Sequence, residues 1–277
     1  MQLKIINYSV AFLMMVSLNL NAQTNSTTSD SAVIGSANIV ENIQPKVQGQ
    51  PQNHYYNIFK INLAALLFKS YSFQYERVLN RKFSVAIQYR IMPESALPFK
   101  SNILKLVGDD PNTKQIIEDF KMSNFAITPE VRIYLNKKGY GRGFYIAPFY
   151  RYASFTSNDL NVFYTDDNNV EQSVKMSGKL TSNTFGFTIG AQNSIGKHFV
   201  FDWSLFGPHY GSGKGTFIGT TTKPLSQNEQ NVLKQQLDNI DIPLTNKTVN
   251  VNANSASLKL DGPWAGIRFT IGLGYRF

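Results

Sequence analysis

Apolar residues alternate with polar or small residues along several short stretches between residue 57 and the last residue of the chain. The last stretch is the most regular, because from Ala265 to Phe277 every second residue is apolar. Side chains of a strand point alternately to its two faces, so this strand is expected to have one apolar and one polar face. In a membrane barrel the apolar face contacts lipid, whereas in a soluble sandwich it lies in the core.

Seven further stretches alternate in the same way, which predicts eight strands. The fifth is the least regular, because Tyr145 and Phe149 fall on its polar face. The abundance of Tyr and Phe, with 14 and 20 copies, also favours strands. The stretches cover residues 59–67, 71–76, 83–91, 124–133, 144–152, 185–192, 199–205 and 265–277.

The links between these stretches alternate in length. Links 79–82, 136–142 and 194–198 are short, whereas 92–121, 156–179 and 207–263 are long; only the short link 68–70 breaks the rule. Outer-membrane barrels have short periplasmic turns and longer outer loops, and a soluble barrel has no reason to sort its loops in this way. The pattern therefore predicts an all-β fold, an eight-stranded antiparallel transmembrane β-barrel.

Short helices are expected in two of the long, extracellular loops. Asp110 and Pro111 fit an N-cap followed by the first helical residue, and Ser226 with Glu229 fits a capping box. These helices could cap the barrel mouth or contact a partner, or the loops could simply fold over themselves.

The first residues have the layout of a secretory signal peptide, with Lys4 followed by an apolar stretch from Val10 to Leu20 and a small residue, Ala22. We expect residues 1–22 to be cleaved off; the alternative is a buried N-terminal helix. Residues 23–56 are rich in Ser, Thr, Asn and Gln, and we interpret them as a flexible periplasmic leader. The barrel then covers residues 57–277, and the expected location is the cell outer membrane.

Composition removes several other classes of protein. The chain has no cysteine, so it has no disulfides and no thiolate metal site. After the first segment, no apolar run approaches the roughly 20 residues that a spanning helix needs. The formal charge is +9, but the basic residues are scattered singly, which argues against a nucleic-acid partner. Anionic lipid headgroups and the phosphates of lipopolysaccharide are more compatible with such a protein.

Several charged residues fall on the polar faces of the predicted strands and should therefore line the barrel. An eight-stranded barrel is just wide enough for side chains to fill it, and buried charges must pair. We expect a salt-bridge network that plugs the interior; the alternative is an ion gate or a narrow pore. The residues are Lys60, Glu76, Arg90, Glu130, Arg132, Arg151, Asp202 and Arg268.

With these residues laid out, the chain resembles small eight-stranded outer-membrane barrels of the OmpA and OmpX type. The segment Phe206-Gly207-Pro208-His209-Tyr210-Gly211 and the Asn/Gln/Tyr-rich style resemble a Bacteroidota barrel family of unknown function. Tyr275 and Phe277 resemble the C-terminal signal that the barrel-assembly machinery recognises in its clients. The resemblance implies that machinery as a partner during biogenesis, but it implies no activity.

No catalytic, cofactor or metal site is predicted. Residues 207–215 resemble a phosphate loop, but Pro208 and Gly215 occupy positions that the motif reserves for Gly and for Ser or Thr, so we expect a flexible turn. His209 and Ser212 could form a nucleophile pair of the lipid A deacylase kind, but no third group marks a triad. His54 and His198 lack ligand spacing.

The leading functional hypothesis is a non-enzymatic barrel with a structural, surface-interaction or complex-subunit role, contacting an envelope protein through its long outer loops. The alternatives are a barrel enzyme that modifies lipid A or phospholipid, and a small ion-conducting pore. A soluble sandwich is the architectural rival.

Overall fold

The computed structural model describes residues 55–106, 111–136, 139–240, 242 and 244–277. The predicted signal peptide and the predicted leader up to residue 54 lie outside the described residues. The described part is mostly antiparallel β-sheet, with 64% of it in strands and few helices, which confirms the all-β prediction. Within it, no helix is both long and apolar enough to cross a membrane.

The described residues form eleven strands of one sheet, whereas the sequence pattern predicted eight. The difference arises where a predicted strand is interrupted briefly or where a predicted loop is strand. The strands are β1 (Asn57–Asn62), β2 (Tyr71–Val78), β3 (Phe83–Ala96), β4 (Lys121–Tyr134), β5 (Gly143–Thr165), β6 (Glu171–Ile195), β7 (Phe199–Phe206), β8 (Pro208–Thr220), β9 (Asn246–Val251), β10 (Ser255–Ile267) and β11 (Thr270–Arg276).

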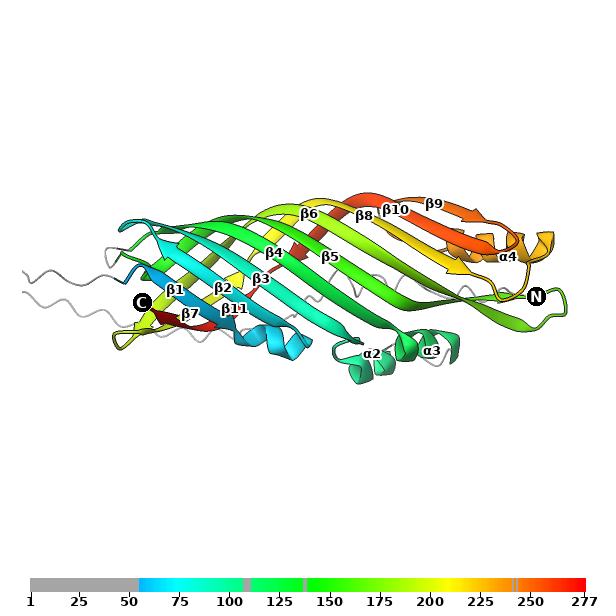
Figure 1. The fold of residues 1–277 in the computed structure, drawn as a ribbon, viewed down its shortest axis with the longest axis horizontal. Helices are drawn as coiled ribbons and strands as arrows, with labels where there is room; N and C mark the ends of the chain where they lie inside the picture. The colour runs from blue at the N-terminus through cyan, green and yellow to red at the C-terminus, as the bar shows by residue number, and fades with distance from the viewer. Residues whose placement is uncertain (1–54, 107–110, 137–138, 241, 243) are drawn as a thin grey trace, which may run out of the picture. The chain divides into compact units, whose positions relative to one another are not determined.

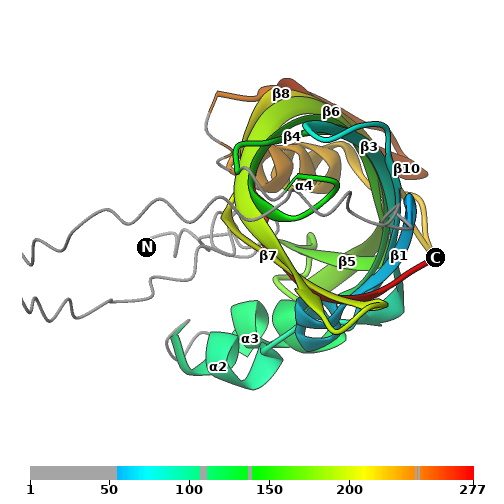
Figure 2. The same cartoon turned by 90° about the vertical axis from the view of Figure 1, so that its left-hand side faces the viewer.

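Eight of these strands close into a ring. Their order is β5-β4-β3-β2-β1-β11-β7-β6, and β6 pairs back onto β5 (Figures 1 and 2). Every pairing is antiparallel. The register places apolar residues of neighbouring strands side by side on the same face of the sheet: Ile61 lies opposite Leu273 on β11 and opposite Phe73 on β2. These side chains all face out of the ring and are partly exposed. We call this part of the molecule the ring.

Beyond the ring, β5 and β6 continue as a long hairpin, and β8 and β10 continue alongside β6 (Figure 1). Strand β9 adds to the outer edge of β10. We call these continued strands and the helices packed on them the extension. The predicted loop 156–179 is therefore largely strand, and about half of the predicted loop 207–263 is strand, including most of the Gly-rich segment that was predicted to be a flexible turn. A side chain at Gly211 would clash with the Asn183 carbonyl, 2.0 Å from the position of its Cβ.

Four helices occur among the described residues: η1 (Leu63–Phe68), α2 (Lys100–Leu106), α3 (Pro111–Asp119) and α4 (Gln227–Asp238). The prediction that 63–67 continue the first strand is wrong. Asn62 instead caps a 3₁₀ helix, its side chain accepting from the Ala64 N–H at 3.1 Å. The predicted capping box of Ser226 and Glu229 is confirmed at the start of α4. The start of α3 at Pro111 is also confirmed, although Asp110 lies outside the described residues, and α2 was not predicted.

Along β6, the polarity of the two faces reverses at about residue 183 while the alternation of side chains continues without a break. In the ring, the outward residues are apolar: Phe185, Phe187 and Ile189. The inward residues there are polar: Thr184, Thr188 and Gln192. In the extension, the outward residues are polar: Lys175, Ser177 and Lys179. The inward residues there are apolar: Val174, Met176 and Leu180.

The inward face of the extension forms a dry core. Helix α4 lies within the outline of the strands when the ring is viewed end on (Figure 2), and its Leu233 and Leu237 are fully buried. They belong to a cluster that includes Met176, Phe217 and Leu258 from three different strands. A second apolar cluster joins α2 and α3 to the ends of β3 and β4. The extension is thus apolar inside and polar outside, whereas the ring has the opposite arrangement.

Candidate functional site

The interior of the ring holds a buried network of ion pairs. Lys60 on β1 donates to Glu76 on β2 at 2.5 Å and to Asp202 on β7 at 2.7 Å. A third bond runs to the Gln192 amide oxygen at 2.6 Å. These side chains belong to four strands, so the network depends on closure of the ring.

Arg132 on β4 extends the network across the ring. Its Nη1 lies 2.7 Å from Asp202 and 3.2 Å from Glu76, and its Nε donates to Glu130 at 2.7 Å. Its guanidinium also stacks 4.3 Å from the centre of the Tyr145 ring. Glu130 in turn accepts from Arg268 at 2.6 Å. Six of the eight predicted interior residues are therefore linked in one network.

Polar side chains that were not among the predicted site residues complete this network. The Tyr134 hydroxyl donates to Glu76 at 2.7 Å, and the Tyr145 hydroxyl donates to Asp202 at 2.8 Å. Ser84 also donates to Glu76, and Gln74 donates to Glu130. All of them stand at inward positions of their strands, so strand parity could have identified them.

The network is sealed and charge-balanced. Lys60 is 3% exposed, Arg132 1%, and Glu76 and Asp202 0%, so water does not reach these groups. Three cations, counting Arg268, face three carboxylates. In such a site the desolvation cost of each ion is offset only if every partner is present, and the loss of one partner typically costs about 3–5 kcal/mol.

The two remaining predicted residues, Arg90 and Arg151, point into the ring but do not join this network. Arg90 donates to the Ser70 hydroxyl at 3.0 Å, and Arg151 donates to the Thr128 hydroxyl at 3.1 Å. Neither guanidinium is paired with a carboxylate among the residues that the structure describes.

His209 and Ser212 do not form a nucleophile pair. They stand three positions apart on β8, so their side chains point to opposite faces. His209 faces inward, with its ring 6.1 Å from that of Phe149, whereas Ser212 is exposed on the outside. A base on the other side of the sheet cannot activate this hydroxyl.

The other histidines do not form a site either. His198 stacks on Tyr275, and its Nδ1 lies 3.1 Å from the Arg276 carbonyl oxygen. His54 lies outside the described residues. Across the ranges that the structure does describe, no three His, Asp or Glu side chains are grouped to hold a metal ion.

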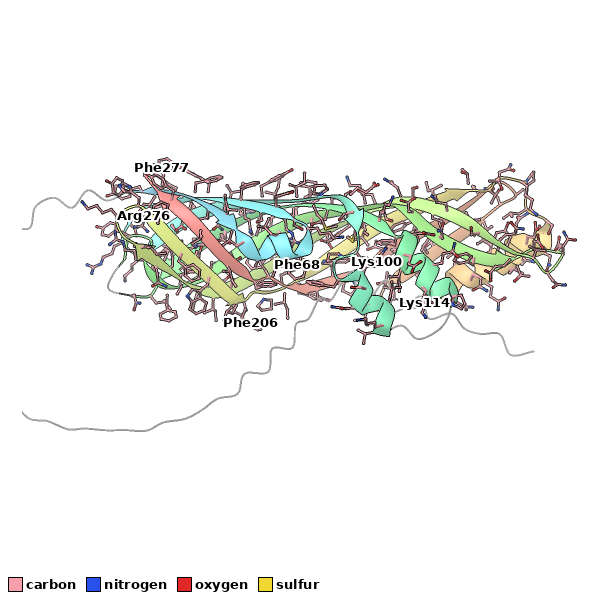
Figure 3. All side chains as sticks on the ribbon, turned by 90° about the horizontal axis from the view of Figure 1, so that it is seen from below. Phe68, Lys100, Lys114, Phe206, Arg276 and Phe277 are labelled. Atoms are coloured by element: carbon pink, nitrogen blue, oxygen red, sulfur yellow. The ribbon has the colours of Figure 1, made fainter. Side chains whose placement is uncertain are left out.

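Tyr275 and Phe277 face outward at the end of β11, with their rings stacked 6.4 Å apart. Figure 3 shows Phe277 and Arg276 at one end of the described part, well separated from Lys100 and Lys114 on α2 and α3. The aromatic residues on which the predicted assembly signal depends are therefore accessible from outside the ring.

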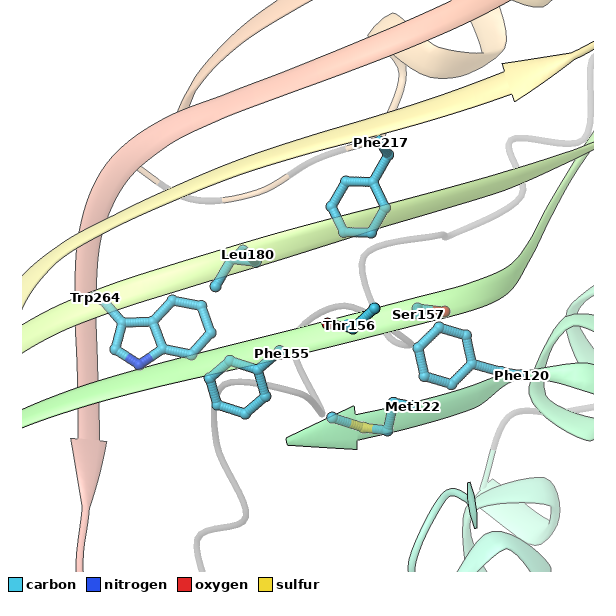
Figure 4. Close-up of a pocket in the computed structure, with 8 residues that line it drawn as sticks. All are labelled: Phe120, Met122, Phe155, Thr156, Ser157, Leu180, Phe217 and Trp264. Carbon is cyan, nitrogen blue, oxygen red and sulfur yellow. The ribbon is translucent and has the colours of Figure 1, made fainter. Parts of the chain in front are cut away.

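A small cavity lies inside the extension, where the two apolar clusters meet (Figure 4). Its volume is about 10 Å³, roughly the space of one water molecule, and its walls are almost entirely apolar, so it is neither large enough nor polar enough for a substrate. The lining residues are Phe120, Met122, Phe155, Thr156, Ser157, Leu180, Phe217 and Trp264.

Comparison with known protein families, with curated proteins and with solved structures found no match for this chain.

Proposed function

We propose that residues 57–277 form a non-enzymatic outer-membrane β-barrel, with the ring spanning the bilayer and the extension standing in water above it. The observation that carries this proposal is the reversal of polarity along β6. Phe185, Phe187 and Ile189 present apolar surface outward, which costs free energy in water and is favourable in lipid. Nearer the start of the same strand, six and ten residues before Phe185, outward Lys179 and Lys175 suit water.

The height of the apolar belt fits a bilayer. The outward positions of β6 from Phe185 to Ile195 are apolar except for Asn193. This stretch extends about 33 Å at about 3.3 Å per residue, and a strand tilt of about 40° reduces this to about 25 Å along the membrane normal. That is the usual height of the lipid-facing band of an outer-membrane barrel.

The lengths of the connections between strands support one orientation of the ring in the membrane. The turns that join β2 to β3 and β6 to β7 are short and lie at the end of the ring near Phe277, whereas the β5–β6 hairpin and the segment from β8 to β10 extend from the other end (Figure 1). In outer-membrane barrels the short turns are periplasmic. The proposal includes export by the signal peptide at 1–22 and recognition of Tyr275 and Phe277 by the barrel-assembly machinery.

The proposed role is structural or adhesive rather than transport or catalysis. The buried network of Lys60, Arg132 and Asp202 closes the ring at its own level, and the core around Leu233 fills the extension, which argues against an open aqueous path. The separation of His209 from Ser212 removes the one catalytic pair that was considered. The polar outer surface of the extension is the part available to an envelope partner, and the lysines of α2 and α3 suit the phosphates of lipopolysaccharide.

Epitope insertion in intact cells tests this proposal. A short tag between Asp167 and Asn168, in the turn at the tip of the β5–β6 hairpin, should be detected by antibody on unbroken cells. A tag between Lys138 and Gly139, in the short link between β4 and β5, should be detected only after the outer membrane is opened. Detection of both tags only in lysed cells, with the protein in the soluble fraction, would contradict the proposal.

A further inference from the structure

Arg90 and Arg151 lie in one layer of the ring interior, next to Arg268 of the sealed network and on the side of that network toward the dry core. Arg90 on β3 stands opposite Ala126 of β4, and Arg151 on β5 donates to Thr128, the next inward residue of β4. The two arginines therefore flank the same strand. Arg268 adjoins the same level, because its guanidinium lies 5.1 Å from the centre of the Phe149 ring, two residues before Arg151 on β5. The charges of Arg90 and Arg268 both act on the Arg151 guanidinium.

Among the described residues, no carboxylate pairs with Arg90 or Arg151 to balance the positive charge of this layer. Lys60, Arg132 and Arg268 are matched by the three carboxylates of the network. Arg276, at the end of the ring, donates to the backbone carbonyls of Tyr140 and Gly141. Within the described part of the chain, Arg90 and Arg151 each have one hydroxyl as side-chain partner, whereas buried cations are normally paired with an opposite charge.

Several hydrogen-bond donors in this layer have no acceptor among the described residues. A guanidinium carries five N–H groups, yet within that part of the chain Arg151 makes one side-chain hydrogen bond, and the buried Nε atoms of Arg90 and Arg268 meet no acceptor there. Nδ1 of His209 is also buried and has no hydrogen-bond partner among the described residues, and its ring lies 6.1 Å from that of Phe149, which the Arg268 guanidinium also contacts. Arg90, Arg151 and His209 nevertheless each keep some accessible surface, so protein atoms do not fill this level completely.

We infer that Arg90 and Arg151 bind one small oxyanion of the phosphate or sulfate type inside the ring. The planar fork of a guanidinium matches two oxygens of such an anion, and two forks can hold it from two sides. The Ser70 and Thr128 hydroxyls hold the two guanidinium groups in place. The anion supplies the negative charge that balances Arg90 and Arg151, because the carboxylates of the network pair with other cations. This inference concerns the ring interior and does not depend on the membrane proposal.

The test measures the thermal unfolding midpoint of the whole chain, purified in a mild detergent, as sodium phosphate or sulfate replaces chloride at constant ionic strength. A ligand that binds only the folded state raises the midpoint, by about 5 °C when it is present at a hundred times its dissociation constant. We expect a saturable rise with either oxyanion for the wild-type chain. No rise, or a rise that never saturates, would overturn the inference.

Two variants and a control locate the effect. Arg151→Gln should lose the oxyanion-dependent rise, whereas Lys179→Gln, which removes an exposed lysine from the outside of β6, should keep it in full. Thr128→Asp places a carboxylate beside Arg151, so this variant should have a higher midpoint than the wild-type chain in chloride and should no longer respond to phosphate. An unchanged phosphate response in Thr128→Asp would overturn the inference even if Arg151→Gln fails to fold.

Discussion

Nζ of Lys60 lies 2.7 Å from Oδ2 of Asp202, although 142 positions separate the two residues along the chain. Their strands, β1 and β7, are not neighbours, because β11 lies between them. The contact therefore forms only when the start and the end of the described sheet have come together. Asp202 also accepts a hydrogen bond from Arg132 on β4, on the far side of the ring.

Replacement of Asp202 by Ala should destabilise the protein strongly. The variant leaves Lys60 and Arg132 buried with too few acceptors, and we expect a loss of about 3–5 kcal/mol in the free energy of unfolding. Urea titration in detergent micelles would measure it. The matched control is Asp261→Ala, because Asp261 pairs with Lys214 at 3.1 Å but both side chains are more than half exposed. The control should change stability by less than about 1 kcal/mol; equal losses in the two variants would contradict the account of the network.

An arginine placed on the outside of β6 should have a position-dependent cost. Phe187→Arg puts a charge in the proposed lipid belt and should cost about 2–4 kcal/mol in phospholipid bilayers. Ser173→Arg puts the same charge on the same face of the strand, in the extension, and should change stability by less than about 0.5 kcal/mol. If both variants are tolerated equally in bilayers, the belt does not face lipid.

The extension should depend on α4 for its core. Leu233 is fully buried, so Leu233→Ala should lower the stability of the extension by about 2–5 kcal/mol. Hydrogen exchange should then speed up in α4, β9 and the outer parts of β5 and β6, whereas amides of β1 and β2 stay protected. Gln235→Ala, on the exposed side of the same helix, should leave the exchange pattern unchanged. Uniform loss of protection in Leu233→Ala would mean that the ring and the extension unfold as one unit.

The tip of the β5–β6 hairpin should be sensitive to acid. The backbone N–H groups of Val170 and Asn168 donate to the Asp166 carboxylate at 2.9 Å, and these bonds, with that from Val170 the stronger influence, lower the pKa of Asp166 below its ordinary value. A lowered pKa means that the stabilisation is complete above the pKa of the unfolded chain and is lost as the pH falls through the folded value. Exchange at the Val170 amide, corrected for its intrinsic pH dependence, should therefore accelerate in acid. Asp166→Asn should abolish that dependence, and an identical acid response in this variant would assign it to another group.

The sequence predicted the ring better than the extension, and β6 shows why. Its apolar residues stand at odd positions from Phe185 to Ile189 but at even positions from Val174 to Leu180. A prediction that follows apolar residues at odd positions alone therefore starts the strand at 185, although the strand begins at Glu171 and continues without a break. In our proposal the outer face of β6 passes from lipid into water at this point, whereas the extended backbone of the strand stays the same.

The end of the first predicted strand was wrong for a local reason. Residues 63–68 read Leu-Ala-Ala-Leu-Leu-Phe, an apolar run without alternation, and such a run fits a buried strand or a helix equally well. The Asn62 side chain, which caps the Ala64 N–H, decides in favour of the helix. The preference of Asn for the N-cap position could have suggested this hydrogen bond, whereas the spacing of apolar residues could not.

Strand parity could predict which residues face the interior, whereas it could not predict which of them pair with one another. Tyr145 and Phe149 looked like irregularities of the fifth strand, yet Tyr145 donates to Asp202, and Phe149 lies under the Arg268 guanidinium at 5.1 Å. Which cation meets which carboxylate depends on the register of strands that are far apart in the sequence. Arg90 and Arg151 were grouped with the network for the same reason, and only the three-dimensional structure separates them from it.

The chain has no cysteine, so single cysteines can carry a fluorescent probe without background labelling, and this gives the most direct test of the central claim. Probes at Ile189→Cys and Ser173→Cys would be compared after reconstitution into vesicles, with lipids brominated in their acyl chains and with iodide in the water. We predict that bromolipid quenches the probe at 189 and that iodide does not, with the opposite result at 173. Quenching of the probe at 189 by iodide, at the strength found at 173, would contradict a lipid-facing belt.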